Sequence, residues 1–266
     1  MIRLREFAAP QASANQRRVV QLAALLGVLQ NRVIFAGECA LDFLLTKHSI
    51  AQIARPARSN PVVSLVAYGS PDRLGVELRQ LGLQPDGGRT GADLWRTPDG
   101  GRLELIAPEG WQAVANPWYQ YVLECTLQIQ PGHGPAFRVA GAPAFLATQL
   151  HGAGVNQRTR KFLSGYSWLE DTVLLALGRR ELEREMAAAP PDVRAHIRDS
   201  LQPLLFGDEP LATVHALLPR AVRSPLAAQR ALGTLRRIAG LSSSEPETAL
   251  RSGGYMSWLA SPNPPT

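Results

Sequence analysis

Hydrophobic positions in the first part of the chain alternate between strand-like and helix-like spacing. Residues 33–36 form a short apolar run that stops at Gly37, and residues 38–46 then carry apolar side chains at helical spacing. A second run rich in β-forming residues covers 61–68, after a basic loop that contains proline. This pattern predicts a strand, a glycine turn, a helix and a second strand.

The other segments of this half continue to interleave strands and helices. We expect a helix over 13–30, capped by Ser13 and weakened at Gly27, and another over 72–83. Residues 93–108 predict a hairpin around the turn at 98–101, and residues 137–140 a short strand. Residues 1–11 fit an irregular segment or a short edge strand, and residues 119–129 fit a helix or a strand. The alternation favours the α/β class.

Strand signals stop after about residue 141. Helical patterns follow one another over 142–151, 167–177, 179–188, 191–206, 209–218 and 225–239. Serine and proline dominate from residue 241 onward. We therefore predict a mixed-sheet α/β domain over 1–140, an α-helical domain over 141–240 and a flexible tail over 241–266.

Composition narrows the class of protein. Of the 266 residues, 45% are hydrophobic and 19% are charged, which is typical of soluble globular proteins. No apolar run approaches the roughly 20 residues of a membrane helix, and the first residues lack the pattern of a signal peptide. We expect a cytoplasmic protein without membrane association. Cys39 and Cys125 form no CxxC pair and are expected to be free thiols, and the five histidines show no zinc-site spacing.

The net charge of +6 comes almost entirely from arginine, because only Lys47 and Lys161 are lysines. Arginine suits phosphate groups and planar acids, so the charge favours a nucleotide or RNA partner. An ordinary basic, solvated surface stays open as the alternative.

Several segments, taken in order, resemble one protein family. VIFAGECALDFLL, IARPARSNPVVSLVA, DLWRTPDGGRLELIAP and SWLEDTVLLALGRRELEREM follow one another as their counterparts do in the AbiEii-type nucleotidyltransferases. Those proteins are the toxin-like components of abortive-infection and type IV toxin–antitoxin systems. The resemblance covers residues 15–218 and depends on the ordered series rather than on a single motif.

The resemblance implies a nucleotidyltransferase-like mixed sheet, Mg²⁺ as cofactor, a nucleoside triphosphate with an RNA or protein acceptor, and an antitoxin as protein partner. It places Glu104 at the third catalytic, metal-binding acid. It assigns substrate binding to Gly37, Glu38, Arg55, Arg58, Gln149 and Arg158. The residues alone leave plainer alternatives open: ordinary turn chemistry for Gly37, an exposed strand position for Glu104, and a solvated face for the arginines.

The departures from the family pattern fall on catalytic positions. Metal-binding acids on a strand must be two apart, because only residues i and i+2 share a face. The corresponding positions here are Val62 and Ser64, which leaves Glu104 as the only one of three acids. Glu38 puts a negative charge where a triphosphate would approach, and Gln149 replaces a lysine. A lone Glu104 can hold Mg²⁺ only weakly, and it does not fit two-metal chemistry.

Three functional hypotheses follow. The leading one is a pseudoenzyme whose nucleotide transfer is lost or strongly impaired, and which acts by binding a nucleotide, an RNA or a protein partner. The second is an active metal-dependent nucleotidyltransferase that modifies an RNA or protein acceptor, and the third is a structural subunit. The helix over 225–239 carries Arg230, Arg236 and Arg237 on its polar face, which could bind RNA or a partner or simply pack on the domain.

Overall fold

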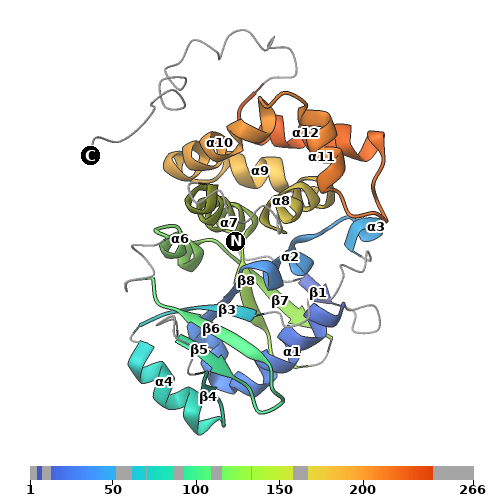
Figure 1. Ribbon diagram of the computed structural model, residues 1–266. Helices are drawn as coiled ribbons and strands as arrows, with labels where there is room; N and C mark the ends of the chain where they lie inside the picture. Colours follow the sequence, from blue (N-terminus) through green and yellow to red (C-terminus); the bar gives the residue numbers. More distant parts are fainter. Residues whose placement is uncertain are drawn as a thin grey trace, which may run out of the picture.

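A mixed β-sheet with flanking helices, and a further set of helices that follows it in the chain, make up the described part of the protein. The computed structural model describes residues 5–7, 13–51, 62–69, 71–86, 93–108, 116–132, 134–157 and 167–241. In Figure 1 the sheet and its flanking helices occupy the lower part, and the helices that follow residue 141 occupy the upper part. The predicted α/β character, with helices after the sheet, is confirmed.

The strands of the sheet come from both ends of the first 140 residues. They are β1 (Arg5–Phe7), β2 (Val33–Ala36), β3 (Val62–Ala67), β4 (Gln84–Pro85), β5 (Asp93–Arg96), β6 (Arg102–Ile106), β7 (Thr126–Pro131) and β8 (Phe137–Ala140). Their order in the sheet is β1-β7-β8-β2-β3-β6-β5-β4. β2 runs antiparallel to β3 and parallel to β8, whereas β3 and β6 are parallel. The predicted hairpin is the antiparallel pair β5 and β6.

Side-chain alternation gives the centre of this sheet two different faces. Val63, Leu65 and Leu103 are buried on one face, whereas Ser64 and Glu104 are half-buried on the other. Helix α4 (Pro71–Gln80) covers the apolar face beside Trp95, because a Cβ added to Gly75 would lie 3.2 Å from the indole ring. The opposite face therefore carries Ser64 and Glu104, two positions of the predicted site.

Helix α1 (Ala14–Leu26) begins at the predicted cap. The Ser13 hydroxyl accepts a hydrogen bond from the Gln16 main chain (3.1 Å), and the Ser13 N–H donates to the Gln16 side chain (2.7 Å). The same hydroxyl donates to Asp42 (2.7 Å) on α2 (Glu38–Leu44). Gly27, with a φ of 54°, ends the α-helix earlier than the expected residue 30, and the 3₁₀-helix η2 (Gly27–Arg32) continues to β2.

Some segments differ from the sequence-based expectation. Residues 119–129 form both alternatives, α6 (Tyr119–Glu124) and then β7, because only the second part pairs with β8. A short helix, α3 (His48–Ala51), was not predicted, and neither was β4, which pairs with β5. Of the two alternatives left open for residues 1–11, residues 5–7 form the short edge strand.

The helices of the second part follow the predicted boundaries closely, except that α7 continues to residue 157 instead of ending at the expected residue 151. They are α7 (Ala142–Gln157), α8 (Ser167–Gly178), α9 (Leu182–Ala187), α10 (Pro191–Leu205), α11 (Pro210–Leu217) and α12 (Pro225–Ile238). α9 is shorter than expected, because residues 180–181 form a turn. The Ser224 hydroxyl caps α12 by accepting from the Ala227 N–H (3.2 Å), and the apolar face of α12 is buried, so its predicted packing is confirmed. The tail beyond residue 241 lies outside the described residues.

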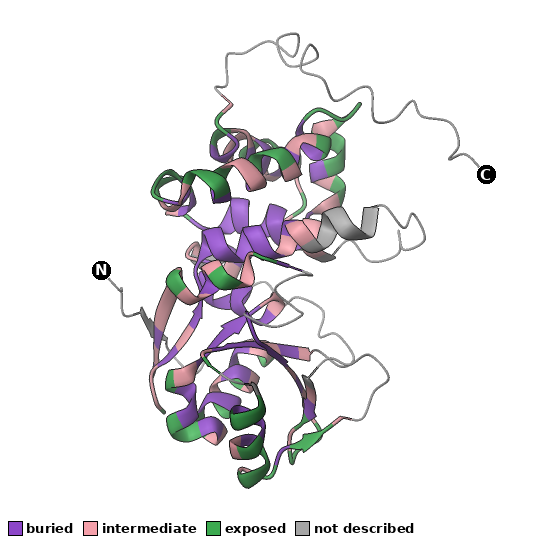
Figure 2. Cartoon of the chain, turned by 90° about the vertical axis from the view of Figure 1, so that its left-hand side faces the viewer, coloured by how far each residue is buried: buried purple, intermediate pink, exposed green. Residues whose placement is uncertain are grey.

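Figure 2 shows that buried residues continue from the sheet into α7 and α8. None of the helices among the described residues combines the length and the apolar character that a membrane crossing needs. Neither Cys39 nor Cys125 forms a disulfide, as predicted.

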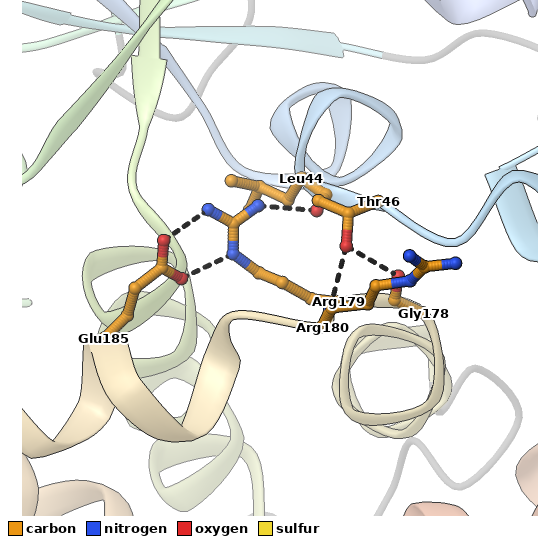
Figure 3. Close-up of polar contacts among 6 residues, drawn as sticks. All are labelled: Leu44, Thr46, Gly178, Arg179, Arg180 and Glu185. Atoms are coloured by element: carbon orange, nitrogen blue, oxygen red, sulfur yellow. Dashed lines mark hydrogen bonds and ion pairs between the residues drawn. The ribbon is translucent and has the colours of Figure 1, made fainter. Parts of the chain in front are cut away.

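The end of α8 joins the helical part to the segment after α2. The N–H groups of Thr46 and Lys47 donate to the Gly178 carbonyl at 2.9 and 2.8 Å. Arg179 donates to the Leu44 carbonyl (2.6 Å) and to the Glu185 carboxylate, and Figure 3 shows its guanidinium between these two acceptors. Main-chain and side-chain hydrogen bonds therefore hold the two parts together at this point.

Candidate functional site

The predicted glycine turn lies between β2 and α2. Gly37 has a φ of 68° and a ψ of −155°, a backbone conformation that is essentially restricted to glycine. A Cβ at this position would lie 3.3 Å from the Ser64 hydroxyl oxygen and 4.0 Å from Nε2 of Gln149. The turn thus requires glycine for its own geometry, and it lies directly beside two side chains of the predicted site.

Ser64 and Glu104 are neighbours across the parallel strands β3 and β6. The strand register pairs them directly, and it also pairs Ser64 with Ala36, the residue before the turn. The Ser64 hydroxyl lies 3.4 Å from Oε2 of Glu104, which makes a long hydrogen bond. Burial raises the pKa of Glu104, and the hydrogen bond from Ser64 opposes this effect only in part. The carboxyl group therefore keeps its proton to a higher pH than an exposed glutamate.

Tyr119 adds a third polar side chain to this face. It belongs to α6, which contacts β2 and β3. Burial, together with the negative charge of Glu104, raises the pKa of Tyr119 to about 12, so the phenol is neutral at physiological pH. Sequence reasoning missed this neighbour, because Tyr119 lies in the segment that fitted either a helix or a strand and no spacing along the chain relates it to Glu104. We refer to Ser64, Glu104, Tyr119 and Gln149 as the polar cluster.

The strand position beside Val62 carries a cation rather than a metal ligand. The register pairs Val62 with Arg102, whose Nε donates to Oδ2 of Asp86 at 2.8 Å. Arg96 donates to the other oxygen of Asp86, also at 2.8 Å. The hydrogen bond from Arg96, helped by the charges of both arginines, lowers the pKa of Asp86. Asp86 is thus held by two arginines.

The polar cluster does not fit Mg²⁺, the ion that the family resemblance implies. Mg²⁺ is usually held by one or two carboxylates together with water and phosphate oxygens. Here the strand positions offer a valine and a serine hydroxyl beside one carboxyl group, whose pKa is raised. No group of three or more His, Cys, Asp and Glu side chains suited to a metal comes together within the described ranges.

The structure brings some of the predicted site residues together and does not place others. Gly37, Gln149 and Glu104 gather around Ser64, while Glu38 lies half-buried in the first turn of α2. Arg55, Arg58 and Arg158 lie outside the described residues, so their predicted substrate-binding roles stay predictions.

Comparisons with protein-family models, with curated proteins and with solved structures gave no match. The resemblance to AbiEii-type nucleotidyltransferases thus stays a prediction from the ordered sequence segments.

Proposed function

We propose that this chain is a nucleotidyltransferase-like protein whose nucleotide transfer is lost or strongly impaired, and which acts by binding a nucleotide, an RNA or a protein partner. The observation that supports this proposal is the pairing of Ser64 with Glu104 next to Val62. Nucleotidyl transfer depends on metal ions that orient the nucleophile and neutralise developing charge. A hydroxyl and a single carboxyl group with raised pKa are poor substitutes for three carboxylates.

The polar cluster offers hydrogen bonds without strong charge. A tyrosine with a pKa of about 12 donates one hydrogen bond, a serine hydroxyl donates or accepts, and an amide does both. Such a set suits neutral polar groups of a ligand better than a triphosphate. Glu38 adds an acidic side chain in the first turn of α2. Its negative charge also disfavours a triphosphate at this site.

The test is a labelled-transfer assay with matched variants. The purified protein is incubated with labelled nucleoside triphosphates, Mg²⁺ or Mn²⁺, and total tRNA or cell protein as acceptor. We expect no transfer above that of Glu104→Gln. Robust transfer by the unmodified protein that disappears in Glu104→Gln would overturn the proposal and favour the active-enzyme alternative.

A second variant tests whether β3 has the geometry of a nucleotidyltransferase strand that binds metal. Val62→Asp combined with Ser64→Asp places two acids on the strand face next to Glu104. We expect this double variant to gain metal-dependent transfer if β3 has the family geometry. A double variant that folds but shows no transfer would contradict a nucleotidyltransferase-like geometry of β3. Val63→Asp is not a suitable control, because Val63 is buried in the core.

A further inference from the structure

A basic pocket lies at the junction between the helical part and the segment after α2, and it shares none of its lining with the polar cluster. Its volume is about 370 Å³, and it is lined by α12, by the segment from the end of α8 to the start of α9, and by Lys47. Five of the ten lining residues are basic and one is acidic. The charged side chains that the argument uses are Lys47, Arg180, Glu183, Arg230 and Arg237, and these five define the basic pocket.

Three of these cations are not neutralised by an acid within the described part of the chain. Arg237 pairs with Glu183 at 2.9 Å, and the neighbouring Arg179 is satisfied by Glu185. Lys47, Arg180 and Arg230 form no ion pair among the described residues. Figure 3 shows the two consecutive arginines in opposite directions, with Arg179 toward Glu185 and Arg180 away from it. The pocket therefore holds an excess of positive charge.

Hydrogen bonds at the junction hold the ammonium group of Lys47 and the main chain of Arg180 in place. The Lys47 N–H donates to Gly178, and its ammonium donates to the Leu177 carbonyl at 2.5 Å. The main-chain N–H of Arg180 donates to the Thr46 hydroxyl at 2.8 Å. Burial, and then the charges of Arg230 and Arg180, lower the pKa of Lys47, while Glu183 opposes this effect. Cations that the fold holds close together repel one another, and a bound anion lowers the free energy by relieving this repulsion.

We propose that the basic pocket binds the di- or triphosphate group of a small phosphorylated molecule. The cations converge on one concave site from three separate segments, whereas an RNA backbone is usually contacted by charges that spread along a surface. Guanidinium groups make paired hydrogen bonds to phosphate oxygens, and an ammonium adds a point charge. The lining contains no aromatic side chain on which a base could stack, so the phosphates supply the recognition.

The test measures binding of inorganic tripolyphosphate to the full chain by calorimetry, without divalent metal and at low ionic strength. This probe carries no base and cannot be transferred, so the result is independent of the transfer assay above. We expect saturable binding at one site that weakens as salt increases. Arg180→Gln combined with Arg230→Gln should weaken binding by about tenfold or more, because each substitution removes one positive charge and its charge-assisted hydrogen bonds to the phosphate oxygens.

Two further variants separate this site from general electrostatics. Arg194→Gln combined with Arg220→Gln removes the same charge from exposed positions outside the pocket and should leave binding unchanged. Glu183→Gln should strengthen binding, an outcome that a misfolded variant would not give. The proposal is overturned by an absence of saturable binding, or by equal losses in both double variants. It is also overturned if a single-stranded RNA binds through Arg180 and Arg230 while tripolyphosphate does not.

Discussion

Glu185 holds the guanidinium of Arg179 through two hydrogen bonds of 2.5 and 2.6 Å, and the Arg179 side chain is only 5% exposed. The third contact of this guanidinium is the Leu44 carbonyl at 2.6 Å. The pair therefore connects α9 with the end of α2, and it fixes the turn that carries Arg180.

Glu185→Gln should lower the free energy of unfolding by about 2 kcal/mol, because a buried cation loses its counter-charge. Chemical denaturation followed by circular dichroism measures this change. The control is Asp199→Asn, which removes the exposed ion pair of Asp199 with Arg198 and should cost less than about 0.5 kcal/mol. Equal effects of the two substitutions would contradict the importance of burial at Arg179.

Gly178→Ala should destabilise the protein by about 1–3 kcal/mol through overpacking. The added Cβ would lie 2.6 Å from a methyl group of Leu45 and 2.9 Å from one of Ile50, and both side chains are buried. The contrasting variant is Gly233→Ala inside α12, where the nearest group is the flexible end of Arg237 at 3.3 Å. Replacing that helical glycine should stabilise the protein by about 0.5–1 kcal/mol. Thermal melts of the two variants should therefore shift in opposite directions.

Gly37→Ala should cost about 1–3 kcal/mol, because alanine strongly disfavours a φ of 68° with a ψ of −155°. Its Cβ would also press on the Ser64 hydroxyl at 3.3 Å. Gly27→Ala is a matched comparison, since Gly27 also has a positive φ but a Cβ there meets nothing within 4 Å. Urea unfolding should show a larger loss of unfolding free energy for Gly37→Ala than for Gly27→Ala. Combining Gly37→Ala with Ser64→Ala should reduce this difference, because the serine hydroxyl is then absent. Equal losses of unfolding free energy for Gly37→Ala and Gly27→Ala would show that the close contact with Ser64 does not affect stability.

Glu104→Gln should make the protein more stable at neutral pH. Burial raises the pKa of Glu104, so the folded state holds this proton to a higher pH than the unfolded state does. Stability is therefore lost as the pH rises from the ordinary value of 4.5 through the folded pKa, and the cost persists above it. Glutamine avoids ionisation, so the difference in melting temperature between variant and parent should grow over that range.

The control for this pH dependence is Glu124→Gln, because Glu124 is exposed at the end of α6. The difference in melting temperature between Glu124→Gln and the parent protein should stay nearly constant over the same pH range. A Glu104→Gln protein that loses stability at neutral pH would mean that the carboxylate form is favoured in the folded state.

Short-range signals in the sequence determined most of the secondary structure. The apolar run that ends at Gly37 gave β2, the turn and α2, and Ser13 gave the start of α1. The Ser224 cap and the positive-φ Gly240 likewise lie at the two limits of the helix predicted over 225–239. These signals work because caps, positive-φ glycines and apolar spacing act within a few residues of one another.

Only the tertiary structure decided how distant segments meet. Residues 119–129 divide into α6 and β7 because β8 supplies a pairing partner for the second part alone. The contact of Ser64 with Glu104 depends on strand register, and the approach of Lys47 to Arg180 and Arg230 depends on packing at the junction. Spacing along the chain carries no information about such neighbours, because strand pairing and burial bring them together from distant segments. Lys47 and Leu177, for example, are more than a hundred residues apart in the sequence.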